Sequence, residues 1–190
     1  MSKNGYRVFD SDLHVVEPAG LYHRYLPDGL KSRAPQRNST DHYHHGGWTV
    51  EGHSFPMGLG KGRADAEARA RVVLKEYTQR GFDATAQLEA MDTEGVDAAV
   101  LFRTLPVVCV DAFEPEFAIA LCRAWNDWIT DFRRLDPQRM HAAALLTLHD
   151  PALAARELRR CVTELGMAAA QLMPNPVNGR HVHDPSCDVL

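Results

Sequence analysis

The sequence predicts an α/β protein in which parallel strands alternate with helices. Three nearly all-apolar runs, 96–102, 141–148 and 167–173, have the composition of strands that are covered on both faces. A segment with helical periodicity precedes each run, and a further strand is expected at 6–10. This repeated helix-to-strand unit is typical of a parallel sheet, so we expect about four parallel strands.

Three helices are predicted, over 84–94, 117–132 and 151–165, because apolar residues recur there at helical spacing. Asp83 and Asp150 stand where an N-cap would, and a glycine follows the first and third helices. Starts and stops that are marked in this way fix the boundaries of the expected units.

Residues 18–80 interrupt the alternation with a long insertion directly after the first strand. Loops longer than about 15 residues are usually functional or disordered. We expect this insertion to lie at the carboxyl ends of the strands and to act as a lid within a single domain, 1–190. The histidine-rich stretch 41–45 inside it is expected to be a solvated loop and not a ligand set.

The spacing of the strands leaves room for four strands and three crossovers. A closed (β/α) barrel of the TIM type takes eight strands and typically about 250 residues, so half of such a barrel is expected here. An open doubly wound sheet is the alternative, but the first turn, 10–14, lacks the glycines of a nucleotide site. Because a polar loop and a helix start follow the last strand shortly before Leu190, we expect a truncated barrel.

Composition excludes several classes of protein. The 190 residues include 21 basic and 25 acidic side chains, a formal net charge of -4 that does not suggest nucleic-acid binding. No apolar run is long enough to span a membrane, and no signal segment is seen, so a cytoplasmic location is expected. The four cysteines form no Cys-x-x-Cys pair and are expected to be small buried thiols.

Asp12 and His14 are the candidate metal ligands. Side chains at i and i+2 share one face of a strand, so both are expected to point into the barrel mouth and to hold one ion together. The alternative is that Asp10 or Asp12 caps a turn and that His14 is a hydrogen-bonded core histidine.

Arg103 and Asn175 are the candidate substrate-binding residues, because each follows a predicted strand. The Arg103 guanidinium would face the barrel mouth and bind a substrate carboxylate through two hydrogen bonds. The alternatives are that Arg103 pairs with a structural acid such as Asp111, and that Asn175, between two prolines, only shapes a turn.

Four segments resemble the metal-dependent amidohydrolase superfamily, in the branch of aminocarboxymuconate semialdehyde decarboxylase and the resorcylate-type aromatic acid decarboxylases. They are 10–18, 82–97, Ala124-Trp125-Asn126-Asp127-Trp128 and 172–180. Their order along the chain is that of the family, and together they cover nearly everything outside the insertion.

The resemblance implies a (β/α)8 barrel with a divalent metal, commonly zinc, at the carboxyl ends of the strands. The first two ligands of the family are normally a His-x-His pair, of which His14 matches the second and Asp12 occupies the place of the first. Some decarboxylases of this branch carry an acid there, which leaves manganese as the alternative metal. The family's third and fourth ligands and its catalytic histidine would fall beyond Leu190, so we expect the chain to be inactive alone.

The chemistry expected from the family is hydrolysis or nonoxidative decarboxylation of a small carboxylated substrate. In hydrolysis the metal activates water, whereas in decarboxylation it holds the carboxylate of the substrate. The acid at position 12 favours decarboxylation. The alternative is a non-catalytic fragment or half-barrel binding module, whose open sheet edges would pair in a homo-oligomer or be completed by another chain.

Overall fold

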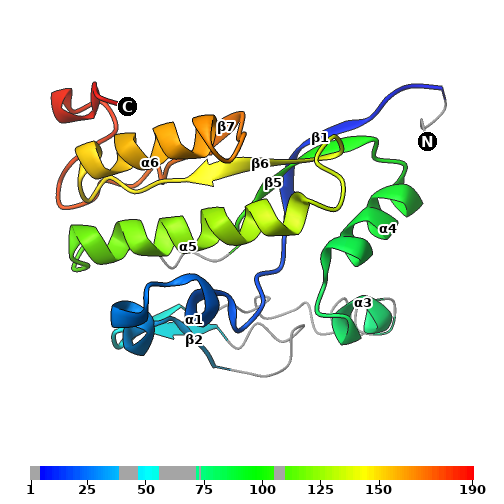
Figure 1. The fold of residues 1–190 in the computed structure, drawn as a ribbon, viewed down its shortest axis with the longest axis horizontal. Coiled ribbons are helices and arrows are strands. Elements are labelled where there is room, and N and C mark those ends of the chain that lie inside the picture. Colours follow the sequence, from blue (N-terminus) through cyan, green and yellow to red (C-terminus); the bar gives the residue numbers. More distant parts are fainter. Residues whose placement is uncertain (1–4, 39–46, 56–71, 73, 105–109) are drawn as a thin grey trace, which may run out of the picture.

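The structure, a computed structural model, describes residues 5–38, 47–55, 72, 74–104 and 110–190. Its main sheet has four parallel strands in the order β1-β5-β6-β7, which confirms the predicted fold class (Figure 1). Among the described residues, no strand pairs with the outer edge of β1 or of β7. The strands are β1 (Phe9–His14), β5 (Ala98–Phe102), β6 (Met140–Leu145) and β7 (Ala169–Gln171).

The three predicted helices are present and lead into consecutive strands. They are α4 (Ala84–Glu94), α5 (Pro115–Arg133) and α6 (Pro151–Thr163). Asp83 Oδ1 accepts a hydrogen bond from the Ala86 amide at 2.7 Å, and Asp150 Oδ1 accepts one from the Leu153 amide at 2.9 Å. Both aspartates are therefore N-caps, as predicted. A short 3-10 helix, η2 (Pro185–Cys187), follows the last strand.

The first strand lies further along the chain than the predicted 6–10. Its polar residues indicate a turn in the sequence, but Phe9 pairs with Ala98 and His14 pairs with Phe102. Main-chain pairing with β5 therefore fixes the limits of this strand, whose side chains are largely exposed.

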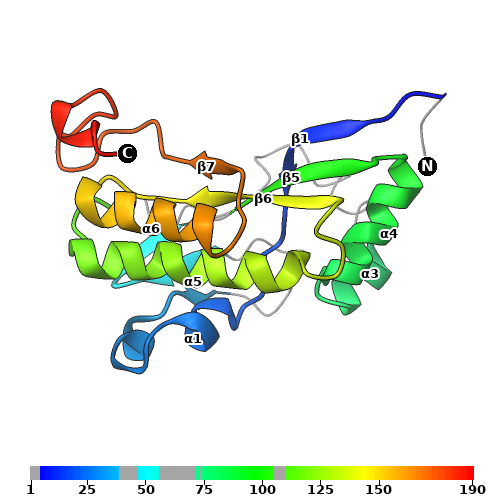
Figure 2. The same ribbon diagram turned by 45° about the horizontal axis from the view of Figure 1, so that its top comes forward.

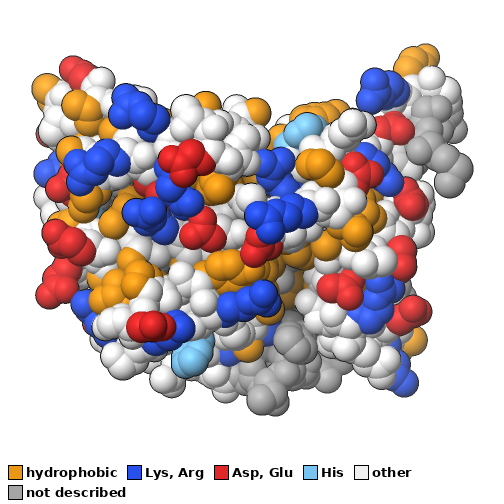
Figure 3. Space-filling view, viewed as in Figure 1, with side chains coloured by type: hydrophobic (Ala, Val, Ile, Leu, Met, Phe, Trp, Pro, Cys, Tyr) orange, Lys and Arg blue, Asp and Glu red, His pale blue; other side chains and the backbone are white. Residues whose placement is uncertain are grey.

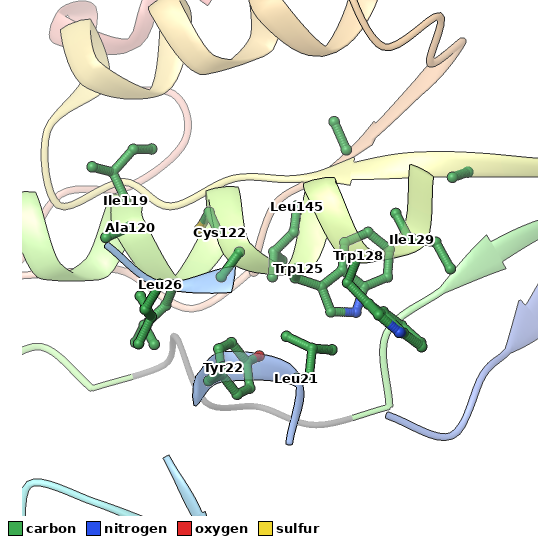
Figure 4. Close-up of a cluster of buried hydrophobic side chains, with 14 of the residues drawn as sticks. Leu21, Tyr22, Leu26, Ile119, Ala120, Cys122, Trp125, Trp128, Ile129 and Leu145 are labelled. Atoms are coloured by element: carbon green, nitrogen blue, oxygen red, sulfur yellow. The ribbon is translucent and has the colours of Figure 1, made fainter. Parts of the chain in front are cut away.

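Helix α5 is buried on two sides because it lies between the main sheet and α1 (Figures 1 and 2). Its large side chains Phe117, Leu121, Trp125 and Ile129 are 0% exposed. Figure 4 shows side chains of α1 and the following residue, among them Leu26, approaching this helix from the side away from the sheet. One continuous core therefore joins the barrel elements to the insertion.

Most of the described part of the insertion 18–80, residues 18–38 and 47–55, forms a small layer packed on α5. Tyr22 of α1 is fully buried and meets the ring of Trp48 edge-on, with ring centroids 6.0 Å apart. Residues 39–46, including the histidine-rich stretch, and 56–71 lie outside the described residues. The lid role stays a prediction. The elements are α1 (Leu21–Tyr25), η1 (Asp28–Arg33), α3 (Lys75–Gln79) and an antiparallel sheet of β2 (Gln36–Arg37), β3 (Trp48–Val50) and β4 (His53–Phe55).

The cysteines and the surface agree with an ordinary globular domain. Cys122, Cys161 and Cys187 are free and buried as predicted, whereas Cys109 lies outside the described residues. Desolvation, followed by the neighbouring Glu157, raises the pKa of the Cys161 thiol. Acidic and basic side chains are interspersed on the face in Figure 3. None of the described helices is long and apolar enough to cross a membrane.

The carboxamide of Asn126 joins α5, β6 and α6. The side chain is 0% exposed, its Oδ1 accepts from the Leu145 amide at 2.7 Å, and its Nδ2 donates to the Leu145 carbonyl at 3.1 Å. Nδ2 also donates to Oε1 of Glu157 at 2.9 Å. Glu157 is itself 3% exposed and receives two bonds from Arg160 at 2.7 and 2.9 Å. We call this set the Asn126 clamp.

We predict that Asn126→Ala lowers the free energy of unfolding by about 3 kcal/mol, because it leaves two buried main-chain groups and a buried carboxylate short of partners. Urea titration followed by circular dichroism measures this loss. Thr130→Ala is the matched control on the same helix, because its hydroxyl bonds only to the Asn126 carbonyl in the hydrogen bonds seen here, and it should cost well under half as much. Equal losses in the two variants would contradict the clamp.

Tyr25 fastens the insertion to α5, since its hydroxyl donates to Asp131 Oδ2 at 2.7 Å. Desolvation, and then this hydrogen bond, raise the pKa of Tyr25 from 10.0 to about 12. The bond therefore stabilises the fold fully below pH 10, and this contribution is lost as the pH rises through 12.

We predict that Tyr25→Phe costs about 1 kcal/mol of stability at pH 7. In a spectrophotometric titration, the difference between wild type and variant should show one phenol that ionises near pH 12. A difference curve centred near 10 would show that Tyr25 does not hold Asp131 in solution.

Candidate functional site

Buried polar side chains gather just beyond the carboxyl ends of β1, β5 and β6. Among the described residues, six polar or charged side chains are buried, and two of them belong to the Asn126 clamp. The other four are Glu17, Arg103, Thr147 and His149, each 5% exposed or less. Burying such groups costs free energy unless they are hydrogen-bonded, so their concentration at one edge of the sheet indicates a candidate functional site.

Asp12 and His14 lie at the carboxyl end of β1 and approach each other. Asp12 Oδ1 is 3.5 Å from His14 Nε2, and the two side chains are 75% and 51% exposed. The His14 ring lies beside that of Phe102 on β5, with centroids 6.4 Å apart. The structure thus brings together the two residues predicted as metal ligands, on the face that the core does not cover.

The donor set of this pair fits a divalent ion. A carboxylate oxygen and an imidazole nitrogen at this separation could bind one ion between them, and this combination suits zinc or manganese. Within the described ranges, no group of three or more His, Cys, Asp or Glu side chains stands ready to hold a metal. The metal role of Asp12 and His14 therefore stays a prediction.

Arg103 directly follows β5 at the carboxyl ends of the strands and is buried there. It is 5% exposed, and its Nη2 contacts the Met173 sulfur just beyond β7. The next residue, Thr104, donates its amide to Glu17 Oε1 at 2.8 Å and its hydroxyl to the Val15 carbonyl at 2.7 Å. The loops after β1 and β5 are thus joined through Thr104, and the role of Arg103 in substrate binding stays a prediction.

Asn175 is exposed in the loop after β7, on the same edge of the sheet as Arg103. Arg180 fixes this loop, because its Nη1 donates to the carbonyls of Leu148 at 2.7 Å and of His149 at 3.1 Å. The loop is therefore held against the connection between β6 and α6, which places Asn175 without burying it.

His149, which stands between β6 and the N-cap Asp150, is a further buried residue of this layer. Its Nε2 lies 2.8 Å from the Val110 carbonyl, and its Nδ1 lies 2.6 Å from the Thr147 hydroxyl. A carbonyl only accepts, so Nε2 carries a proton, and in the neutral ring Nδ1 accepts from Thr147. Its place directly after an apolar strand was the one signal that could have marked it for this layer.

Comparisons with known proteins agree on one family. The model of the amidohydrolases matches residues 9–187. The 2-amino-3-carboxymuconate-6-semialdehyde decarboxylase of Dictyostelium discoideum is 27% identical over 154 residues, which are 78% of this chain and 39% of that protein. The gamma-resorcylate decarboxylase of Rhodococcus jostii is 39% identical over 84 residues, 44% of this chain and 25% of that protein.

Solved structures agree on the fold. An amidohydrolase from Mycobacterium avium subsp. paratuberculosis has a TM-score of 0.72 and 21% identity, covering 97% of this chain and 54% of that one. The 5-carboxyvanillate decarboxylase of Novosphingobium aromaticivorans, solved with manganese and 4-hydroxy-3-methoxy-5-nitrobenzoic acid, has a TM-score of 0.59 and 19% identity, covering 98% and 47%. This chain therefore spans about half the length of these structures, and less of the curated relatives.

Proposed function

Because this chain belongs to the amidohydrolase family, we propose that it serves a metal-dependent, nonoxidative decarboxylation in which Asp12 and His14 provide two of the metal ligands. The observation that carries this proposal is the 3.5 Å approach of Asp12 Oδ1 to His14 Nε2 at the carboxyl end of β1. A catalytic divalent ion typically takes about three protein ligands, so at least one further group outside the described residues must complete the site.

Decarboxylation is preferred over hydrolysis because the two curated relatives described above each carry the name of a decarboxylase. A bound ion would supply the positive charge that holds a substrate carboxylate and a neighbouring oxygen. Manganese is preferred over zinc because a carboxylate stands at position 12 and a structure of the same fold was solved with manganese.

The proposed substrate is a small carboxylated compound of the aromatic acid class, in keeping with the name of the resorcylate relative. We assign Asn175 to its rim, since the amide is exposed and the loop is fixed by Arg180. We assign Arg103, which lies at the same edge of the sheet and contacts Met173, to the binding of the substrate carboxylate.

We predict that Asp12→Ala and His14→Ala each weaken Mn²⁺ binding about 100-fold or more, because each removes one of the two converging donors. Electron paramagnetic resonance counts the free Mn²⁺ at each total concentration. Ser11→Ala, an exposed change between the two aspartates of the same strand, is the control and should bind as wild type does. Unchanged affinity in both ligand variants would reject the site.

The reaction itself is tested with gamma-resorcylate and Mn²⁺. The expected result is release of CO₂ when the group that completes the metal site is present, and loss of this release in both ligand variants. Metal-dependent turnover of an amide or ester, with no CO₂ from any aromatic acid, would replace decarboxylation by hydrolysis.

A further inference from the structure

Strand β1 holds one more residue than β5 over the stretch where the two strands pair. Asp10 lies opposite Ala99, and the next pair is Leu13 opposite Leu101. Three residue steps on β1 therefore correspond to two on β5, which is the signature of a β-bulge.

The extra residue decides which way Asp12 and His14 point. We call these two candidate ligands the metal pair. Leu101 is 0% exposed in the core, and Leu13 opposite it packs against the same core. Had the pairing continued without a bulge, Asp12 would lie opposite Leu101 and its carboxylate would face the core. A one-residue shift moves every later side chain to the other face of a strand. The bulge thus places Asp12 and His14 on the face away from the core.

The Asp10 side chain holds this irregular segment. Its Oδ1 accepts a hydrogen bond from the Asp12 amide at 2.9 Å. That amide lies between the two regular pairs, where the ladder is interrupted, so a side-chain acceptor replaces a strand partner. Asp10 and Leu13 both line a groove beside Met91 of α4, so the Asp10 carboxyl lies on the helix side of the strand. Asp10 therefore contacts the metal pair only at the main-chain amide of Asp12 in the hydrogen bonds described.

We propose that Asp10 is a positioning residue for the metal pair. Its carboxylate fixes the bulge of β1 and so holds Asp12 Oδ1 within 3.5 Å of His14 Nε2. This inference rests on the proposed function, in which Asp12 and His14 bind a divalent ion. The hydrogen bond from the Asp12 amide to Asp10 is present in the structure without that ion.

Four variants separate positioning from charge and from general stability. Asp10→Ala removes the acceptor, Asp10→Asn keeps an acceptor oxygen without the charge, and Asp10→Glu keeps the charge but displaces the oxygen. Asp97→Ala is the matched control, because Asp97 Oδ2 accepts from the Val8 amide at 2.8 Å, directly before β5 and β1 and at their far end from Asp12 and His14.

Mn²⁺ affinity and thermal unfolding are measured on all four variants and on wild type. We expect Asp10→Ala and Asp10→Glu to weaken Mn²⁺ binding about 10- to 100-fold, the usual effect of losing a group that orients a ligand. Asp10→Asn should stay within about threefold of wild type. Asp97→Ala should bind Mn²⁺ as wild type does even if it unfolds at a lower temperature.

Equal Mn²⁺ affinity in wild type and Asp10→Ala would overturn the proposal, as would an equal loss in Asp97→Ala. If Asp10→Ala does not fold, Asp10→Glu against Asp10→Asn makes the same comparison. Hydrogen exchange of the Asp12 amide, followed by NMR without metal, should be slow in wild type and Asp10→Asn and fast in Asp10→Glu. If wild type binds no Mn²⁺, the proposed function fails, and this exchange measurement alone decides the role of Asp10.

Discussion

The fold depends on how the main-chain groups at the end of β6 are satisfied. β5 ends at Phe102, whose neighbour Leu101 pairs with Ala142, so β6 continues beyond the reach of β5. The Asn126 carboxamide takes over by bonding both the amide and the carbonyl of Leu145. Buried main-chain groups are almost always paired, so β5 could not end here without this substitute. Just after the early end of β5, the Thr104 amide bonds Glu17, and the buried polar side chains of the site lie there.

Local signals predicted the helices well and the strands less well. A helix start depends on its own neighbourhood, so Asp83 and Asp150 are recognisable as N-caps from the sequence alone. The limits of β1 depend on a partner strand almost 90 positions away, as the 89-residue separation of Val8 and Asp97 illustrates. These limits therefore cannot be predicted from the residues near β1 alone. Asn126 stood within a family-like motif, but its function as a clamp needed the positions of two other elements.

The candidate site shows the same division between local and distant causes. Alternation along a strand correctly put Asp12 and His14 on one face, but which face depends on the bulge, and the bulge exists only in the pairing with β5. Arg103 was expected to face the mouth because it follows an apolar strand. In the structure Arg103 is buried and its guanidinium contacts Met173, which follows β7. A contact between the ends of two different strands cannot be read from either strand alone.

The exposure of the metal pair shows what else the site needs. Side chains that are 75% and 51% exposed compete with water for an ion, so two such donors hold a divalent ion weakly. Tighter binding needs a further ligand and surroundings that exclude water. Glu17, Arg103 and His149 are already buried at the same edge of the sheet. Hydrogen bonds from Thr104 to Glu17 and to the Val15 carbonyl hold the loops after β1 and β5 together, so a group that covered the pair would meet loops already fixed to each other. If Asp12 and His14 bind the proposed ion, its affinity is therefore set by the further ligand and by what covers the pair.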